Sequence, residues 1–88
     1  MPAILTPAVR DIYKGAGAAT GRKKVKDLTT DGQRHATTSK QNADAMLRAG
    51  STITILETKL LSTGNLWARC PSGWLCVWEK DIDRKFIK

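Results

Sequence analysis

The chain reads Leu66-Trp67-Ala68-Arg69-Cys70-Pro71-Ser72-Gly73-Trp74-Leu75-Cys76-Val77-Trp78 over its most regular stretch, and this stretch decides the fold. Two short runs of apolar and aromatic residues, 66–70 and 74–78, stand on either side of a Pro-Ser-Gly segment typical of a tight turn. The pattern predicts two paired β-strands. All three Trp residues of the chain lie between positions 67 and 78, so they either build a core or form a binding surface.

Further strands are expected on both sides of this hairpin. Residues 51–56 alternate Thr and Ile and predict a strand with Ile53 and Ile55 on one face. Alternation over residues 24–29 predicts a half-exposed strand, and residues 85–88 predict a last short one. Residues 33–44 are polar and aperiodic and predict a long loop, whereas residues 43–48 predict one helical turn ended by Gly50. Short strands separated by turn residues favour an all-β fold, specifically a small barrel.

The chain of 88 residues has room for one domain. We expect residues 24–88 to form the barrel and residues 1–23 to form an irregular or extended N-terminal arm or an extra strand. Within that segment, residues 10–14 are compatible with a short strand or a helical turn. Residues 15–21 contain three glycines and predict a flexible loop, which lacks the Gly-Lys-Ser/Thr ending of a phosphate-binding loop.

The net charge of +7 favours an anionic partner, namely nucleic acid, an acidic wall polymer or an anionic membrane surface. A basic surface that is solvated and has no partner explains the charge equally well. The charge is concentrated in residues 10–26, which hold six Lys and Arg residues against Asp11 alone. Nucleic-acid binding through residues 22–26 and the Trp surface therefore stays open, beside the simpler interpretation of a strand edge protected by lysines.

The N-terminal residues lack the basic and apolar regions of a targeting segment, and no apolar run approaches the length of a membrane span. We expect no membrane insertion. The chain is expected to be cytosolic when made, to be cut from a larger exported protein, or to leave the cell by lysis or inside a virion.

The sequence offers little support for catalysis or metal binding. The single histidine, His35, lies in a polar segment, and a nucleophile–base pair with Cys70 or Cys76 would need the fold to bring them together. Two cysteines are too few for a disulfide framework, and their spacing is not a zinc pattern. We expect two half-buried thiols rather than a cross-strand disulfide, and we expect no enzyme activity, no metal and no cofactor.

Strand alternation gives an inner set of residues that contains no Trp. Ala68 and Cys70 share one face of the first strand, and Leu75 and Val77 share one face of the second. The candidate ligand-binding residues are then those left on or at the rim of the outer face, with Tyr13 beside them: Tyr13, Trp67, Arg69, Trp74 and Trp78. Such a set can stack on a sugar, a base or a proline-rich peptide. The alternative is that one or more Trp residues fill an open end of the barrel.

Three segments resemble the bacterial SH3-like (SH3b) domain family. Residues 46–56 resemble its apolar–Gly strand entry, Asn65-Leu66-Trp67-Ala68-Arg69 resembles its Trp-containing strand, and Ser72-Gly73-Trp74-Leu75 is similar to its Gly-Trp-Val signature. The resemblance covers residues 24–88. The family's Leu-Asn-Val-Arg-x-Gly-Pro motif is absent, since Gln33-Arg34-His35-Ala36-Thr37-Thr38-Ser39 occupies its place.

The resemblance implies a non-catalytic module that binds bacterial cell wall, either peptidoglycan or its peptide cross-bridge. Such modules occur in phage endolysins, cell-wall hydrolases and phage tail proteins, which implies a cell-wall, extracellular or virion-associated location. The absent motif weakens any expectation about a ligand held by that loop. A module that binds another phage or bacterial protein through the same face remains an alternative, as does a small basic nucleic-acid-binding barrel.

Overall fold

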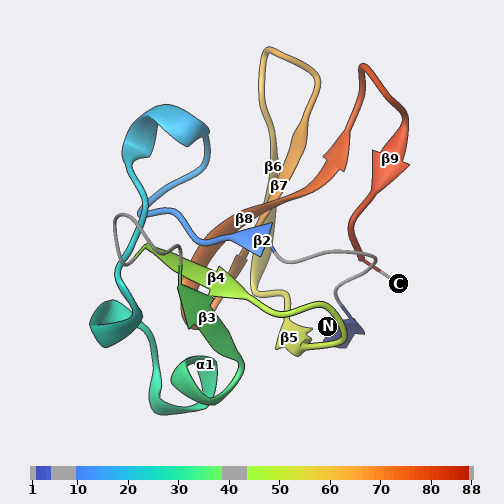
Figure 1. Ribbon diagram of the computed structural model, residues 1–88. Coiled ribbons are helices and arrows are strands. Elements are labelled where there is room, and N and C mark those ends of the chain that lie inside the picture. The colour runs from blue at the N-terminus through green and yellow to red at the C-terminus, as the bar shows by residue number, and fades with distance from the viewer. Residues whose placement is uncertain (1, 5–9, 39–43, 88) are drawn as a thin grey trace.

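The computed structural model describes residues 2–4, 10–38 and 44–87 and shows a mostly β fold (Figure 1). Its strands are β1 (Pro2–Ile4), β2 (Arg10–Asp11), β3 (Ala36–Thr38), β4 (Ala45–Leu47), β5 (Thr52–Thr54), β6 (Glu57–Leu60), β7 (Leu66–Cys70), β8 (Gly73–Glu79) and β9 (Arg84–Lys85). Its helices are the 3-10 turns η1 (Ala18–Thr20) and η2 (Val25–Asp27) and the α-helix α1 (Thr30–Arg34). The predominantly β character predicted from the sequence is confirmed.

Within the described residues the strands form three antiparallel sheets, with orders β1-β5, β2-β4-β3 and β6-β7-β8-β9. In Figure 1 the β6–β7 and β8–β9 hairpins extend upward together, while β3 and α1 lie at the opposite end. The two hairpins are joined near their tips, where the backbone N–H of Lys80 donates to Asn65 Oδ1 at 3.1 Å. Among the described residues, no helix has the length and apolarity needed to cross a bilayer.

The predicted hairpin over residues 66–78 is present as β7 and β8. Its register sets Ala68 opposite Leu75 and Arg69 opposite Trp74. Between Leu66 and Trp67 the register shifts, because Leu66 lies opposite Trp78 whereas Trp67 lies opposite Cys76. This irregularity is a β-bulge at the end of the hairpin, and it interrupts simple alternation along β8.

Side chains of β7 and β8 enter two separate buried clusters. The larger cluster contains the inner residues that alternation predicts, together with residues from β4, β5 and the segments after β2 and η2: Ile12, Leu28, Ala45, Leu47, Ile53, Ala68, Cys70, Leu75 and Val77. A smaller cluster of Trp67, Cys76 and Phe86 lies on the other face. Both faces of this hairpin are therefore covered, which the sequence-based scheme of one inner and one outer face did not anticipate.

Two predicted elements are wrong. Residues 24–29 contain the 3-10 turn η2 (Val25–Asp27) instead of a strand, because the Asp27 carboxylate accepts from the Lys24 backbone N–H and closes the turn. Residues 43–48 contain strand β4 instead of a helical turn, and Ala45 and Leu47 alternate into the core. Gly50 does adopt a positive φ of 87°, but it turns the chain between β4 and β5.

The expected long loop over residues 33–44 is shorter. Thr29 caps helix α1 by accepting from the backbone N–H of Gly32, and β3 follows the helix closely. Residues 39–43 of the predicted loop lie outside the described residues. Helix α1 thus extends into the segment 33–44, whose polar composition predicts irregular structure. Within the part of the chain that the structure describes, α1 is the only helix of more than three residues.

The N-terminal segment contributes to the core. β2 pairs with β4, and Ile12 just after it is fully buried in the larger cluster. The backbone of Tyr13 then bridges β8 at Trp74 and also pairs with Arg22 across the glycine-rich loop. Of the expected N-terminal arm, residues 1 and 5–9 lie outside the described residues, whereas residues 10–13 connect β4, through β2, with β8, through the Tyr13–Trp74 bridge.

Candidate binding face

Tyr13 and Trp74 are held side by side by two backbone hydrogen bonds. The N–H of Tyr13 donates to the Trp74 carbonyl at 2.7 Å, and the N–H of Trp74 donates to the Tyr13 carbonyl at 3.0 Å. Both side chains are half-buried, so each ring keeps an accessible part. We call the surface formed by Tyr13, Trp74, Arg22 and Arg69 the aromatic face.

Gly73 permits this close approach. Its φ is 142°, and a Cβ atom there would lie 2.8 Å from the Tyr13 carbonyl oxygen and 2.9 Å from Ile12 Cγ2. Both neighbours belong to the strand segment that follows β2, so a side chain would push that segment away from β8. The glycine of the predicted turn is therefore required by tertiary packing as well as by turn geometry.

Trp67 lies beneath the aromatic face. It occupies the face of β7 opposite Ala68, as alternation predicts, but only 6% of its surface is exposed. The Tyr13 ring meets the Trp67 ring edge to face, with centroids 5.1 Å apart and an interplanar angle of 74°. The expectation that Trp67 lies on an outer surface is wrong, because Tyr13, Trp74 and Phe86 cover this side of the sheet.

Two arginines flank the aromatic pair. Arg69 lies opposite Trp74 in the hairpin and its Nε donates to Glu57 Oε1 at 2.6 Å. The guanidinium of Arg22 lies 5.8 Å from the centroid of the Tyr13 ring and 3.6 Å from the Asp11 carboxylate. A hydrogen bond to Tyr13, together with the nearby Asp11 carboxylate, raises the pKa of Arg22 above its ordinary value. The face therefore carries two arginines beside two rings, and each arginine is paired with a carboxylate of the same chain.

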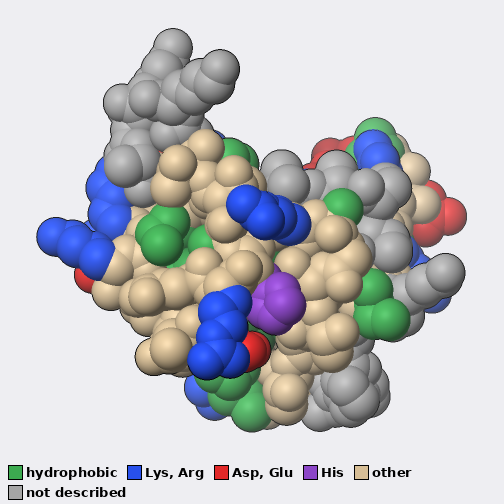
Figure 2. Space-filling view, turned by 60° about the horizontal axis from the view of Figure 1, so that its bottom comes forward, with side chains coloured by type: hydrophobic (Ala, Val, Ile, Leu, Met, Phe, Trp, Pro, Cys, Tyr) green, Lys and Arg blue, Asp and Glu red, His purple; other side chains and the backbone are tan. Residues whose placement is uncertain are grey.

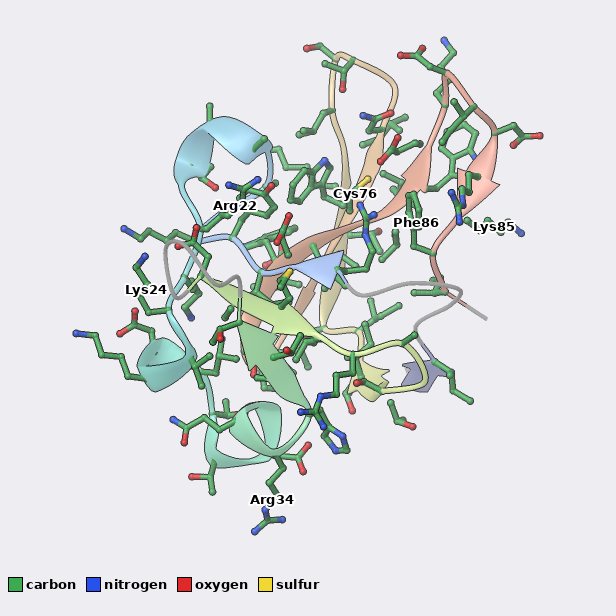
Figure 3. All side chains as sticks on the ribbon, viewed as in Figure 1. Arg22, Lys24, Arg34, Cys76, Lys85 and Phe86 are labelled. Atoms are coloured by element: carbon green, nitrogen blue, oxygen red, sulfur yellow. The ribbon has the colours of Figure 1, made fainter. Side chains whose placement is uncertain are left out.

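Arg22 and Glu57 lie at this surface although the sequence did not select them as site residues. Arg22 was visible only as part of a basic segment, and nothing local shows that the loop between Tyr13 and Arg22 returns the chain to the same ring. Figure 3 shows Arg22 beside this loop, apart from Cys76 and Phe86. The backbone pairing of Tyr13 with Arg22, which only the structure shows, brings Arg22 to this surface.

Trp78 belongs to a different surface. The bulge places it opposite Leu66, away from the side of the sheet that holds Trp67 and Trp74. Its indole Nε1 donates to Asp83 Oδ1 at 3.0 Å. It lines an apolar hollow of about 330 Å³ with Leu66, Val77, Lys85 and Ile87. The structure thus brings Tyr13, Trp67, Arg69 and Trp74 together and leaves Trp78 apart from them.

The two cysteines are free thiols on opposite faces of the hairpin. Cys70 packs in the larger cluster and Cys76 in the smaller one. Burial raises the pKa of the Cys76 thiol, which donates to the Trp78 carbonyl at 3.5 Å. A buried, protonated thiol is a poor nucleophile.

His35 and Cys70 line one hollow of about 280 Å³ near α1. His35 Nε2 lies 4.0 Å from Asp31 Oδ1, and Cys70 is packed in the larger core cluster. Figure 2 shows this end of the molecule, with Lys and Arg side chains around the single histidine. Among the described residues, no three His, Cys, Asp or Glu side chains are grouped to hold a metal ion.

The basic segment 22–26 is largely engaged within the molecule. Lys23 Nζ donates to the Ser72 carbonyl at 2.8 Å, which ties the segment to the turn of the β7–β8 hairpin. Lys24 Nζ lies 2.7 Å from Asp44 Oδ1. With Arg22 beside Asp11, these charges stabilise local contacts and do not form one free cationic stripe.

Comparisons of the chain with protein-family models, with curated proteins and with solved structures find no match.

Proposed function

We propose that this chain is a non-catalytic binding domain with an SH3-like barrel arrangement, and that it recognises bacterial peptidoglycan or its peptide cross-bridge through the aromatic face. A phage endolysin or a tail-associated protein is the context that this function suits. The resemblance of the Trp-turn-Gly-Trp segments to bacterial SH3-like domains supports the choice of ligand.

The observation that carries the proposal is the pairing of two half-buried rings from distant parts of the chain. Reciprocal hydrogen bonds join the backbones of Tyr13 and Trp74, and both side chains pack against the cluster that contains Trp67, so the pair is held in place before a ligand binds. Preorganised aromatic side chains lose little conformational entropy on binding and stack well on sugar or peptide groups. Arg22 and Arg69 lie beside the rings, each paired with one acidic side chain, and the remaining N–H donors of their guanidinium groups can bind a carboxylate of a wall peptide.

The barrel arrangement is supported by how the sheets connect. The Tyr13–Trp74 bridge links the β2-β4-β3 sheet to β8 of the four-stranded sheet, and the larger core cluster lies between them. β5 continues this enclosure through Ile53, which is buried in the same cluster. A small barrel-like core with one aromatic face is consistent with a binding module that leaves catalysis to another domain.

The proposal is tested by sedimentation with purified cell walls at physiological salt. Wild type is expected in the wall pellet, and Trp74→Ala is expected to lower the affinity by about tenfold or more, as for a central aromatic contact. Trp78→Ala is the matched control, because the same residue type is removed from the other surface.

Absence of wild type from the pellet contradicts the proposal, as does an equal loss of binding in the two variants. Circular dichroism on both variants separates lost binding from lost folding. Wall-independent capture of a single protein with fixed stoichiometry would instead support the alternative of a protein-binding module.

A further inference from the structure

Strand β6 is an open edge of the four-stranded sheet. Within the described residues it pairs with β7 on one side only, and all four of its residues are exposed. The outer edge of such a strand presents backbone N–H and C=O groups that a further strand can bind. The side chains along this edge determine which strand can pair with it, and they belong to Leu56-Glu57-Thr58-Lys59-Leu60.

This edge is complementary in charge to a second copy of itself. In an antiparallel pair, two directly opposed residues either exchange backbone hydrogen bonds with each other or exchange none. When the two strands are identical, the two-fold axis therefore lies midway between one residue and the same residue of the second copy. An axis at Thr58 places Glu57 opposite Lys59 of the second copy, and Lys59 opposite Glu57 of the second copy. Axes at Glu57 or Lys59 would oppose like charges, which is destabilising.

The exposed leucines select the same register. Leu56 is 49% exposed and Leu60 is 65% exposed, and together they are two of the four large hydrophobic residues exposed among the described residues. With the axis at Thr58, Leu60 of each copy lies opposite Leu56 of the other copy. Charged and apolar residues therefore favour one register independently of each other.

We propose that β6 pairs antiparallel with β6 of a second copy about a two-fold axis at Thr58, which joins two four-stranded sheets into one. Glu57 then lies between Arg69 of its own chain and Lys59 of the second copy. The axis is perpendicular to the joined sheet, so both aromatic faces lie on the same side. That last consequence bears on the proposed function, whereas the dimer itself does not depend on it.

The first test measures molecular mass by sedimentation equilibrium. The contact is small, so we expect wild type to change from one chain toward two as its concentration rises from about 10 μM to about 1 mM. Leu60→Asn should weaken association by about tenfold, since each substitution acts twice in a symmetric dimer. Ile82→Asn is the matched control, because Ile82 is 58% exposed on the other hairpin.

The second test exchanges charge. Lys59→Glu and Glu57→Lys should each remain a single chain, because like charges then meet across the axis, and an equimolar mixture should form a mixed dimer. Lys26→Glu makes the same charge change away from the edge and should associate like wild type. A wild-type mass of one chain at about 1 mM, equal effects of the Leu60 and Ile82 substitutions, or no association in the mixture would overturn the proposal.

Discussion

Trp67 and Trp74 are separated by one turn of the chain yet have different physical roles. Trp67 is 6% exposed and packs on Tyr13, Cys76 and Phe86, whereas Trp74 keeps part of its ring accessible. In the proposed wall binding, Trp74 therefore contacts the ligand directly, whereas Trp67 supports the Tyr13 ring.

Trp67→Ala is expected to lower the free energy of unfolding by about 3–5 kcal/mol, because it removes a buried aromatic ring and leaves a cavity. Trp74→Ala should cost clearly less, because its ring is only half-buried. Urea unfolding followed by circular dichroism measures both. Equal losses in the two variants would contradict the assignment of Trp67 to the core.

The buried Cys76 thiol should make stability depend on pH. Burial raises its pKa in the folded state, so the folded protein holds this proton more tightly than the unfolded chain does. The contribution is complete below the unfolded thiol pKa of about 8.5 and is lost as pH rises through the raised folded value.

Between about pH 8 and about pH 10.5, the free energy of unfolding should therefore fall more in wild type than in Cys76→Ala. Urea midpoints at the two pH values measure this difference. The comparison removes the contribution of other groups that titrate in the same range, because they are common to both proteins. An identical pH dependence would mean that the thiol is equally solvated in both states.

At the scale of elements, the β7–β8 hairpin was predictable from the sequence because local signals agree there. Turn residues, aromatic and β-branched residues and alternation all favour the same structure. The strand predicted over residues 24–29 is wrong because two side-chain contacts favour a turn there. Asp27 accepts from the Lys24 backbone N–H, and the Lys24 side chain pairs with Asp44. The alternation of polar and apolar residues does not reveal these contacts. The separation of Trp78 from the other Trp residues depends on a β-bulge, and no residue in this stretch indicates a bulge from the sequence alone.

Gly73, the first residue of β8, allows the close approach of β8 to the segment that carries Tyr13. Gly73→Ala is expected to destabilise the fold by about 1–3 kcal/mol, because the new Cβ would press on Tyr13 and Ile12. Gly50→Ala is the control, since Gly50 also has positive φ but a Cβ added there would meet nothing within 4 Å. Thermal unfolding of both variants measures the difference, and an equal loss would show that only backbone strain matters at Gly73.

At the scale of the whole molecule, the candidate site is assembled from segments far apart in sequence, and such pairings carry no local signal. Tyr13 and Trp74 were candidates from sequence, and the backbone bridge between them explains why they meet. The net charge of +7 suggested an anionic partner, but the basic segment 22–26 largely stabilises the fold. Charge alone therefore does not identify a ligand, and the aromatic face carries the functional argument.

The most direct test of the proposed wall binding observes the indole N–H signals of the three Trp residues by NMR while soluble peptidoglycan fragments are added. We predict that the Trp74 signal shifts most, that the Trp67 signal shifts less through Tyr13, and that the Trp78 signal stays in place. Assignment comes from single Trp→Phe variants. A titration in which no indole signal moves, or in which only Trp78 responds, would contradict the claim that this chain binds cell wall through Tyr13 and Trp74.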